Sequence, residues 1–423
     1  RGNIGLGHVR YATKGAAHRE EEAQPFYVNA PYGIVLIHNG NLTNTRELEH
    51  QLFMKDRRHT NSSSDTEMLL NVFATELQSA NQGEEFSPDN IFQAIRVVHE
   101  RVEGSYAAIA LIAGYGLVAF RDPFGIRPLV LGQRFSQETN KNEWMLASES
   151  LVLENNDFKI VRDIDPGEAI FISLDSEIFT AQCSNFPKLF PCSFEYVYLA
   201  RPDSVINGIS VYEARLRMGN VLAETIKQEI TLGDIDVVMP IPDSSRPAAM
   251  QVAKQLGIEY REGFFKNRYI GRTFIMPGQS LRKKSVRQKL NAMGTEFAGK
   301  NILIVDDSIV RGTTSQQIVQ MARDAGANKV VFTSAAPPIR YAHVYGINMP
   351  SRKELIAYNR SIKEIEKELS IDKMVYQNVS NLKEAIITKS KVKELDLSCF
   401  TGDYVTGNIT EEYLNWVETE YLS

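Results

Sequence analysis

The sequence of 423 residues predicts two domains, an α+β domain over residues 1–190 followed by an α/β domain with a mostly parallel sheet over residues 191–423. Length alone suggests two or three domains, at about 150 residues each. The first part mixes short strands with helices, whereas the second repeats the order strand, loop, helix that is typical of βαβ units. An irregular stretch at residues 174–193 separates the two patterns, and we place the domain boundary there.

In the first part, a buried strand at Gly33–Ile37 is expected to end before His38-Asn39-Gly40, because Asn-Gly is most often a tight turn. A helix follows, with an apolar stripe between Met68 and Leu77. We then expect a hairpin and two further strands, at Tyr106–Ile112, Leu117–Phe120, Trp144–Ala147 and Glu168–Ile172. Antiparallel strands mixed with helices in this way favour α+β layers.

In the second part, two apolar strands are expected at Ile235–Met239 and Ile302–Val305. Each is followed by a polar loop and by a helix that has one apolar face and ends at a glycine. Lys329–Ser334 returns as a strand, and residues 361–423 are expected to form helical appendages. This alternation predicts right-handed crossovers and a parallel sheet.

The charge is distributed unevenly. The formal net charge is −5, but Arg261–Leu290 holds nine Lys and Arg against one acid, a local net of +8 that leaves −13 for the remainder. A basic stretch in an acidic chain indicates a compact, highly anionic ligand rather than general nucleic-acid binding.

Composition argues against several other classes of protein. The longest nearly apolar run, Ala107–Phe120, has 14 residues, whereas a bilayer span needs ~20, so no membrane segment is expected. The three cysteines, Cys183, Cys192 and Cys399, form neither a disulfide framework nor a CxxC metal motif. Such cysteine usage suits a reducing, cytoplasmic location.

The sharpest chemical signal follows the strand at Ile302–Val305. Asp306 and Asp307 lie at its carboxyl end, where open parallel sheets bind ligands, and such carboxylates can hold ribose hydroxyls and a hard cation. Arg311-Gly-Thr-Thr314 then opens a helix whose free N–H groups suit a phosphate monoester. The alternative is that the two acids only cap the helix, or belong to a receiver-type domain. The Gly-Thr-Thr sequence directly behind them disfavours this alternative.

Two further segments agree with a phosphorylated ligand. In Pro242–Ser245, Ser244 could add a hydroxyl to the cation, although Ser245 could equally be a plain helix cap. The basic stretch Lys266–Pro277 interleaves cations with aromatic residues and could close over the site as a lid. The alternative for this stretch is a solvated basic surface strand.

At these residues the sequence resembles a known family. Val305–Thr314 is similar to the phosphoribosylpyrophosphate (PRPP) loop of type I phosphoribosyltransferases. Phe194–Ser204 and Lys266–Pro277 resemble glutamine PRPP amidotransferases, and the resemblance covers essentially the whole chain. It implies that Mg²⁺ is bound by Ser244, Asp306 and Asp307, and that PRPP is bound by Lys266, Arg268, Arg272, Asp306, Asp307, Ser308, Arg311, Gly312, Thr313 and Thr314.

The resemblance also implies that the first domain is a glutaminase of the N-terminal-nucleophile (Ntn) hydrolase class. Arg10 would bind the α-carboxylate of glutamine, and Asp65 its α-ammonium. Asn39 and Gly40 would form an oxyanion hole. Taken alone, Asn39-Gly40 could be a turn, and Asp65 could be an acid that interacts with a helix dipole.

Two departures from the family pattern matter. Such glutaminases attack with an N-terminal Cys, but residue 1 is Arg, so we expect the nucleophile and the opening strands to lie upstream. A chain that starts at Arg1 should then use ammonia and not hydrolyse glutamine. Some members also hold an iron–sulfur cluster with four cysteines. Here Cys192 and Cys399 fall at two of those positions and His343 and Asp396 at the others, so no cluster is expected.

The resemblance therefore implies an amidotransferase for the first committed step of purine biosynthesis, in which ammonia attacks C1 of PRPP. The expected partners are PRPP, glutamine or ammonia, and purine nucleotide inhibitors, and the enzyme should be a homo-oligomer that binds neither nucleic acid nor membranes. One alternative is a nucleobase phosphoribosyltransferase, which would leave Arg10, Asn39-Gly40 and Asp65 unexplained. Another is a PRPP-sensing regulator that binds nucleic acid, which the acidic remainder of the chain disfavours.

Overall fold

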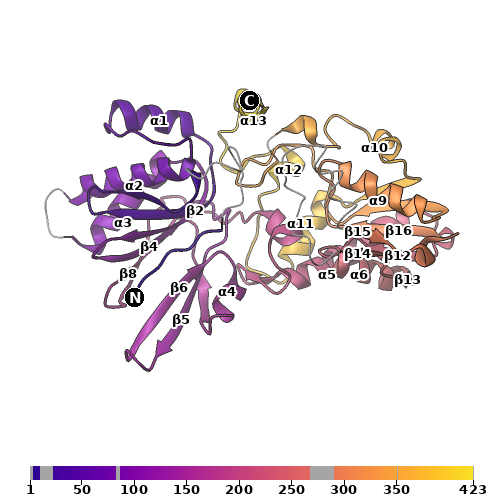
Figure 1. The fold of residues 1–423 in the computed structure, drawn as a ribbon, viewed down its shortest axis with the longest axis horizontal. Helices are drawn as coiled ribbons and strands as arrows, with labels where there is room; N and C mark the ends of the chain where they lie inside the picture. Colours follow the sequence, from indigo (N-terminus) through magenta and orange to yellow (C-terminus); the bar gives the residue numbers. More distant parts are fainter. Residues whose placement is uncertain (1–2, 10–21, 82–85, 267–289, 350, 423) are drawn as a thin grey trace.

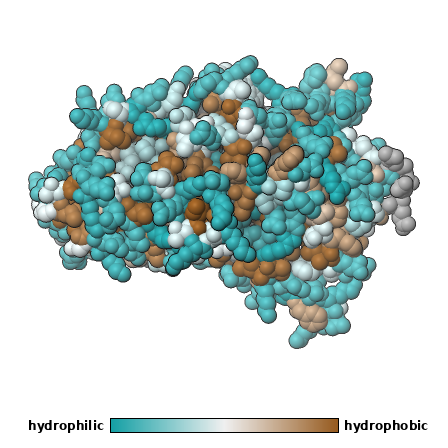
Figure 2. All heavy atoms as spheres, turned by 180° about the vertical axis from the view of Figure 1, so that it is seen from behind, coloured by the Kyte–Doolittle hydropathy of each residue, from teal (hydrophilic) through white to brown (hydrophobic). Residues whose placement is uncertain are grey.

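The structure is a computed structural model that describes residues 3–9, 22–81, 86–266, 290–349 and 351–422. Two domains lie side by side, and the last helix of the chain, α13 (Glu411–Leu422), sits between them (Figure 1). Within the described part of the chain, no helix combines the length and the apolar character that crossing a bilayer requires. The face shown in Figure 2 is mostly hydrophilic, with apolar residues scattered over it in small groups.

The first domain is built on a six-stranded antiparallel sheet in the order β1-β2-β3-β4-β8-β9. Its strands are β1 (Phe26–Val28), β2 (Ile34–Leu42), β3 (Gly104–Ile112), β4 (Gly116–Arg121), β8 (Glu168–Ser173) and β9 (Ile178–Gln182). Apolar residues of one face pack against three helices, α1 (Thr45–Met54), α2 (Asp65–Asn81) and α3 (Pro88–Arg101). The other face packs on a small three-stranded sheet. This sheet consists of β5 (Val130–Ser136), β6 (Lys141–Ala147) and β7 (Lys159–Asp163), and helix α4 (Ser150–Glu154) lies near it. The expected α+β layers and the β3–β4 hairpin are confirmed.

The second domain contains a five-stranded parallel sheet in the order β13-β12-β16-β17-β18. These strands are β12 (Val237–Pro240), β13 (Glu259–Tyr260), β16 (Asn301–Asp306), β17 (Lys329–Ser334) and β18 (Lys373–Tyr376). One face packs against α5 (Val211–Glu229), α6 (Arg246–Leu256) and α11 (Val379–Ile387), and the other against α9 (Thr313–Asp324) and α10 (Ile362–Leu369). The predicted βαβ alternation is therefore confirmed.

Shorter elements complete the second domain. Two antiparallel pairs are formed by β10 (Val205–Ile206) with β11 (Ile209–Ser210), and by β14 (Phe264–Lys266) with β15 (Leu290–Ala292). Short helical segments lie at Glu195–Leu199, Leu232–Asp234, Gly294–Phe297 (α8), Arg352–Glu354 and Ser398–Thr401 (α12).

Two expectations about these elements were wrong. Strand β2 does not end at Ile37 but continues to Leu42, so that Asn39 and Gly40 pair with β3 instead of forming a turn. Residues 361–423 are not simply helical appendages, because they supply β18, the edge strand of the parallel sheet, and α11, which packs on α5.

The C-terminal helix contacts both domains. Its Trp416 ring lies under the guanidinium of Arg46 in α1, with 4.2 Å between the guanidinium carbon and the ring centroid. On the other side, Glu418 Oε1 accepts from Arg352 Nε at 2.9 Å. Helix α13 therefore bridges the two domains.

A buried histidine in the first domain predicts how stability depends on pH. Burial lowers the pKa of His99 to about 4, and its Nδ1 lies 2.8 Å from the Tyr106 hydroxyl. Because the folded pKa is below the ordinary value, the folded state binds fewer protons, and stability falls as pH drops from about 6.5 towards 4. Between pH 7.5 and 5, the free energy of unfolding should fall in both proteins, and we expect the fall to be about 2 kcal/mol smaller in the variant His99→Gln than in the unsubstituted chain. Urea unfolding of both proteins at both pH values measures this, and equal losses would contradict it.

Candidate functional site

The carboxyl end of β16 places two carboxylates at the edge of the parallel sheet. Strand β16 ends at Asp306, Asp307 follows directly, and the two residues are only 9% and 7% exposed. Burial, and then the charge of Asp307, raises the pKa of Asp306 well above its ordinary value, and burial also raises the pKa of Asp307. Because two adjacent buried carboxylates repel each other, a hard cation bound beside them would stabilise both.

Hydroxyl groups surround these carboxylates. Ser244, in the loop after the neighbouring strand β12, hydrogen-bonds through its Oγ to Asp307 Oδ2. Ser308 Oγ donates to Asp307 Oδ1 at 2.8 Å. Ser245 occupies the N-cap position of α6, as the alternative expected, but its hydroxyl donates to the carbonyl of Ile241 and makes no side-chain cap. Carboxylate and hydroxyl oxygens together form a donor set that suits Mg²⁺.

The start of α9 forms a cup next to the carboxylates. Gly312 precedes the helix at φ +76°, where a Cβ would lie 2.4 Å from the Ile356 side chain, so the position requires glycine. Thr313 and Thr314 form the first turn, whose N–H groups and hydroxyls can donate to an anion. The Arg311 side chain is held elsewhere, with its Nε 2.6 Å from Glu354 Oε2. The cup therefore consists of the backbone and the threonines rather than of the Arg311 guanidinium.

The basic stretch begins beside Ser244. Lys266, the last residue of β14, places its Nζ 3.0 Å from Asp243 Oδ2 in the loop that carries Ser244. Arg268 and Arg272 lie outside the described residues, as does Arg10 of the first domain. The structure thus places Lys266 beside the loop that carries Ser244, and the rest of the predicted lid lies outside the described residues.

The open edge of β2 aligns a set of backbone donors. The His38 N–H donates to Gln24 Oε1 at 2.7 Å, and the Leu42 N–H donates to Asp65 Oδ2 at 3.1 Å. Because N–H directions alternate along a strand, the Gly40 N–H points to the same edge, between these two contacts. Asp65 is the first residue of α2 and faces this edge. The predicted oxyanion and ammonium positions thus lie next to each other.

A cavity of about 1450 Å³ opens at this edge. It is lined by three of the residues expected to bind glutamine, Asn39, Gly40 and Asp65, and also by residues 346–348 of the second domain. The wall that belongs to the second domain was not foreseen, because no sequence pattern relates positions so far apart.

His38 also lines this cavity, and sequence reasoning gave it no role. Its Nδ1 lies 2.9 Å from Thr66 Oγ1. The Thr66 hydroxyl accepts a hydrogen bond from Gln24 Nε2 and can donate its own hydrogen to His38 Nδ1. This leaves the Nε2 proton directed towards Asp65 Oδ2, 3.8 Å away. Burial lowers the pKa of His38, against the opposing effect of Asp65, so the ring is neutral at pH 7.

Arg127 was also missed. Its side chain is buried, lines the same cavity and contacts Glu195 through Nη2 at 3.0 Å. Among the described residues, its Nε and Nη1 have no hydrogen-bond partner. They are buried donors that the described residues leave unsatisfied.

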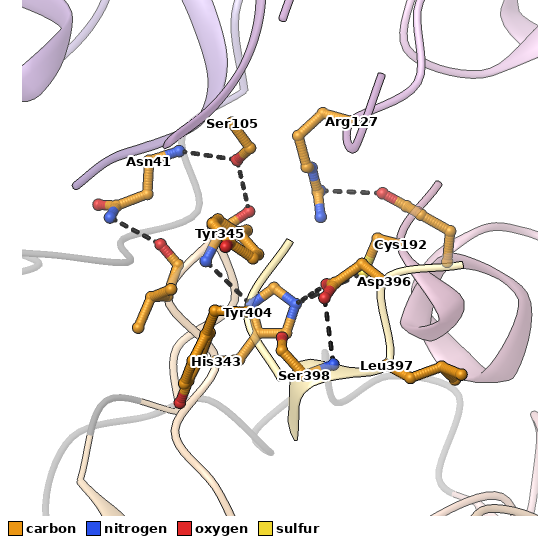
Figure 3. Close-up of polar contacts among 12 residues, drawn as sticks. Asn41, Ser105, Arg127, Cys192, His343, Tyr345, Asp396, Leu397, Ser398 and Tyr404 are labelled. Atoms are coloured by element: carbon orange, nitrogen blue, oxygen red, sulfur yellow. Dashed lines mark hydrogen bonds and ion pairs between the residues drawn. The ribbon is translucent and has the colours of Figure 1, made fainter. Parts of the chain in front are cut away.

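The two domains touch directly behind the oxyanion position (Figure 3). Asn41 Nδ2 donates to the carbonyl of Val344 at 2.9 Å, and Ser105 Oγ donates to the carbonyl of Tyr345 at 2.9 Å. Gly346 packs so closely on Gly40 that a Cβ on Gly346 would lie 2.9 Å from the Gly40 carbonyl. The segment 344–346 therefore supports the strand that carries Gly40.

Comparisons with known proteins match each of the two domains to a family model. Residues 8–155 match the model of a glutamine amidotransferase domain, and residues 210–359 match that of a phosphoribosyl transferase domain. The chain is 56% identical over 418 residues to an amidophosphoribosyltransferase of Pseudomonas aeruginosa, covering 99% of this chain and 83% of that protein. It is 53% identical over 419 residues to the Escherichia coli protein of the same name, covering 99% and 82%.

Solved structures give the same result. One is described as a glutamine PRPP amidotransferase from Bacillus subtilis complexed with ADP and GMP. It has a TM-score of 0.78 and 36% identity, over 94% of this chain and 82% of that one. Another, described as the allosteric regulatory enzyme of purine biosynthesis, has a TM-score of 0.81 and 35% identity, over 98% and 84%.

Proposed function

The chain belongs to the amidophosphoribosyltransferase family, the enzymes of the first step of purine biosynthesis, and we propose that its two sites divide that reaction between them. The site at the carboxyl end of the parallel sheet binds PRPP. The cavity at the edge of β2 binds glutamine. Ammonia from the glutamine cavity attacks C1 of PRPP at the parallel sheet, pyrophosphate leaves, and 5-phosphoribosylamine forms.

The PRPP site is assigned from one juxtaposition, the two carboxylates directly in front of the cup at the start of α9. Asp306 and Asp307 accept hydrogen bonds from the ribose hydroxyls. The N–H groups and hydroxyls of Ser308 and of residues 312–314 hold the 5′-phosphate, and the helix terminus adds favourable electrostatics. Lys266 approaches the diphosphate, and the roles of Arg268 and Arg272 there stay predictions from the sequence.

The donor set of Asp306, Asp307 and Ser244 fits Mg²⁺, because it offers carboxylate and hydroxyl oxygens at one buried position. When bound, Mg²⁺ would neutralise charge on the diphosphate. The protein's own residues orient the sugar and exclude water, since a sugar that becomes cationic at C1 would otherwise react with it.

In the cavity, the Gly40 N–H and the Asn39 amide stabilise negative charge on the amide oxygen of glutamine. Asp65 accepts from the α-ammonium, while neutral His38 beside it leaves the carboxylate its full charge. Arg10 as the partner of the α-carboxylate stays a prediction from the sequence. The contact of residues 346–348 with this cavity supports a short internal route for ammonia towards the second domain.

Purine nucleotides are proposed as inhibitors of this chain. The Bacillus subtilis relative is described as complexed with ADP and GMP. A nucleoside phosphate carries the same ribose and 5′-phosphate as PRPP, so the carboxylates and the cup would bind it in competition with the substrate. A homo-oligomeric state also stays a prediction.

The test supplies PRPP, Mg²⁺ and ammonia, and follows the release of pyrophosphate. We expect release that depends on ammonia and is inhibited by GMP or AMP. Replacing ammonia by adenine, guanine or hypoxanthine should give no release above background. Release with a nucleobase but not with ammonia would instead show a nucleobase phosphoribosyltransferase.

A further inference from the structure

Three buried side chains of the second domain meet near its contact with the first domain (Figure 3). Cys192, His343 and Asp396 come from three separate segments and are 0%, 3% and 1% exposed. The backbone holds them in place, because Cys192 and Asp396 form a parallel β-bridge and the Ser193 N–H donates to the Asp396 carbonyl at 3.1 Å. The proposed reaction uses none of the three.

The distances between their donor atoms resemble those between two ligand atoms bound to the same metal ion. Cys192 Sγ lies 3.5 Å from His343 Nε2, which lies 3.4 Å from Asp396 Oδ2. A charge-assisted N–H···O hydrogen bond would measure about 2.7–2.9 Å, so the second contact is long for one. Tetrahedral ligands of Zn²⁺ with ordinary bond lengths are separated by about 3.6 Å for sulfur and nitrogen and about 3.4 Å for nitrogen and oxygen.

The remaining polar atoms of two of these side chains are engaged elsewhere. Asp396 Oδ1 accepts from the Ser398 N–H at 3.1 Å, and His343 Nδ1 accepts from the Tyr345 N–H at 3.3 Å. Without a metal, the ring therefore carries its proton on Nε2. A cation at Nε2 would move that proton to Nδ1, at the expense of the long Tyr345 contact. The Cys192 thiol would release its proton to solvent, so that one thiolate and one carboxylate balance a divalent charge.

The donor types select the metal. A four-cysteine cage is what an iron–sulfur cluster ordinarily requires, and this site offers one thiolate, one imidazole and one carboxylate, which does not fit such a cluster. A mixed sulfur, nitrogen and oxygen set suits Zn²⁺, which has no geometric preference of its own. We propose that Cys192, His343 and Asp396 supply three ligands of a bound zinc ion.

Such an ion would brace the contact between the two domains. His343 directly precedes the segment 344–346, which accepts hydrogen bonds from Asn41 and Ser105 of the first domain. A zinc ion would tie the start of this segment to the beginning and to the C-terminal part of the second domain.

The experiment refolds the full chain from denaturant with Zn²⁺, because the cluster is buried, and measures metal content after extensive dialysis. We expect about one zinc per chain, and at least a tenfold lower content in Cys192→Ser and Asp396→Asn. Asp396→Asn keeps the acceptor for the Ser398 N–H and the side-chain volume. Cys183→Ser is the matched control, since Cys183 is also buried but packs in the first domain near Phe92, and it should retain the full content.

Refolding the unsubstituted chain with Co²⁺ gives a readout that does not depend on the variants folding. Thiolate-to-cobalt charge-transfer bands, together with the intense visible bands of tetrahedral Co²⁺, would support the site. A zinc content below a tenth of an equivalent, together with no charge-transfer band, would overturn the proposal. The three side chains would then form only a hydrogen-bond network. Bound iron with inorganic sulfide would overturn it as well.

Discussion

Replacing Asp306 by asparagine should lower ammonia-dependent pyrophosphate release at least about a thousandfold, while the protein without Mg²⁺ becomes more stable. The carboxylate is proposed to hold both the ribose and the cation, so activity falls steeply. Stability moves the other way because the pKa of Asp306 is raised by burial and by Asp307, which means that its charge opposes folding at neutral pH. Removing that charge should add about 1 kcal/mol to the free energy of unfolding.

Asp236→Asn provides the control for this experiment. Asp236 precedes β12 at the opposite end of the sheet and accepts from the Asn301 N–H at 2.7 Å. Its substitution should change activity less than about twofold, as expected for an exposed side chain away from the site. If Asp306→Asn kept full activity, the assignment of the PRPP site would be wrong. If it instead lost activity together with stability, Asp306 would be a structural residue.

Replacing Gly40 by alanine should lower the free energy of unfolding of the first domain by about 3 kcal/mol or more. Gly40 has φ +145°, and a Cβ there would lie 2.1 Å from the carbonyl oxygen of Ser105 in β3. Because the obstacle is backbone in the middle of a paired strand, relief requires the β2–β3 ladder to open. Urea unfolding measures the loss.

Gly114→Ala separates the two causes of the stability loss at Gly40, which are the strain of a positive φ and the close approach of β3. Gly114 also has a positive φ, +83°, but a Cβ there would meet no atom within 4 Å. Its replacement should cost only about 1 kcal/mol, the strain of the backbone conformation alone. Equal losses in the two variants would show that close packing on β3 contributes nothing at Gly40.

The sequence predicted the parallel sheet and the strand, loop and helix around Asp306 well, because their signals are local. Asp306, Asp307 and the residues 312–314 lie within one strand, loop and helix, and a periodic pattern places them directly. Strand β18 was missed because only four residues form it, between two helices, and its pairing with β17 is decided by tertiary contacts. The Asn39-Gly40 pair was ambiguous because the same dipeptide serves a turn or a close approach of two strands, and here it serves the second.

Other parts of the sites could not be predicted, since they depend on contacts between distant segments. His38 faces Asp65 only because β2 extends past it, and Arg127 reaches the cavity from a loop with no motif. Arg311 was expected to face the phosphate, but Glu354, far along the chain, competes for its guanidinium. Such competition between charges is invisible in a single linear pattern.

The contact of Gly346 on Gly40 limits how freely this protein can be rearranged during evolution or in the laboratory. A side chain at position 346 would meet the backbone of Gly40 in the other domain, whereas a side chain at position 40 would meet β3 of its own domain, so the restriction that crosses the domain contact falls on Gly346. Chimaeras that take the second half of the molecule from a relative should therefore assemble only if the donor keeps glycine at the position of Gly346. The halves behave as co-adapted pieces rather than as interchangeable modules.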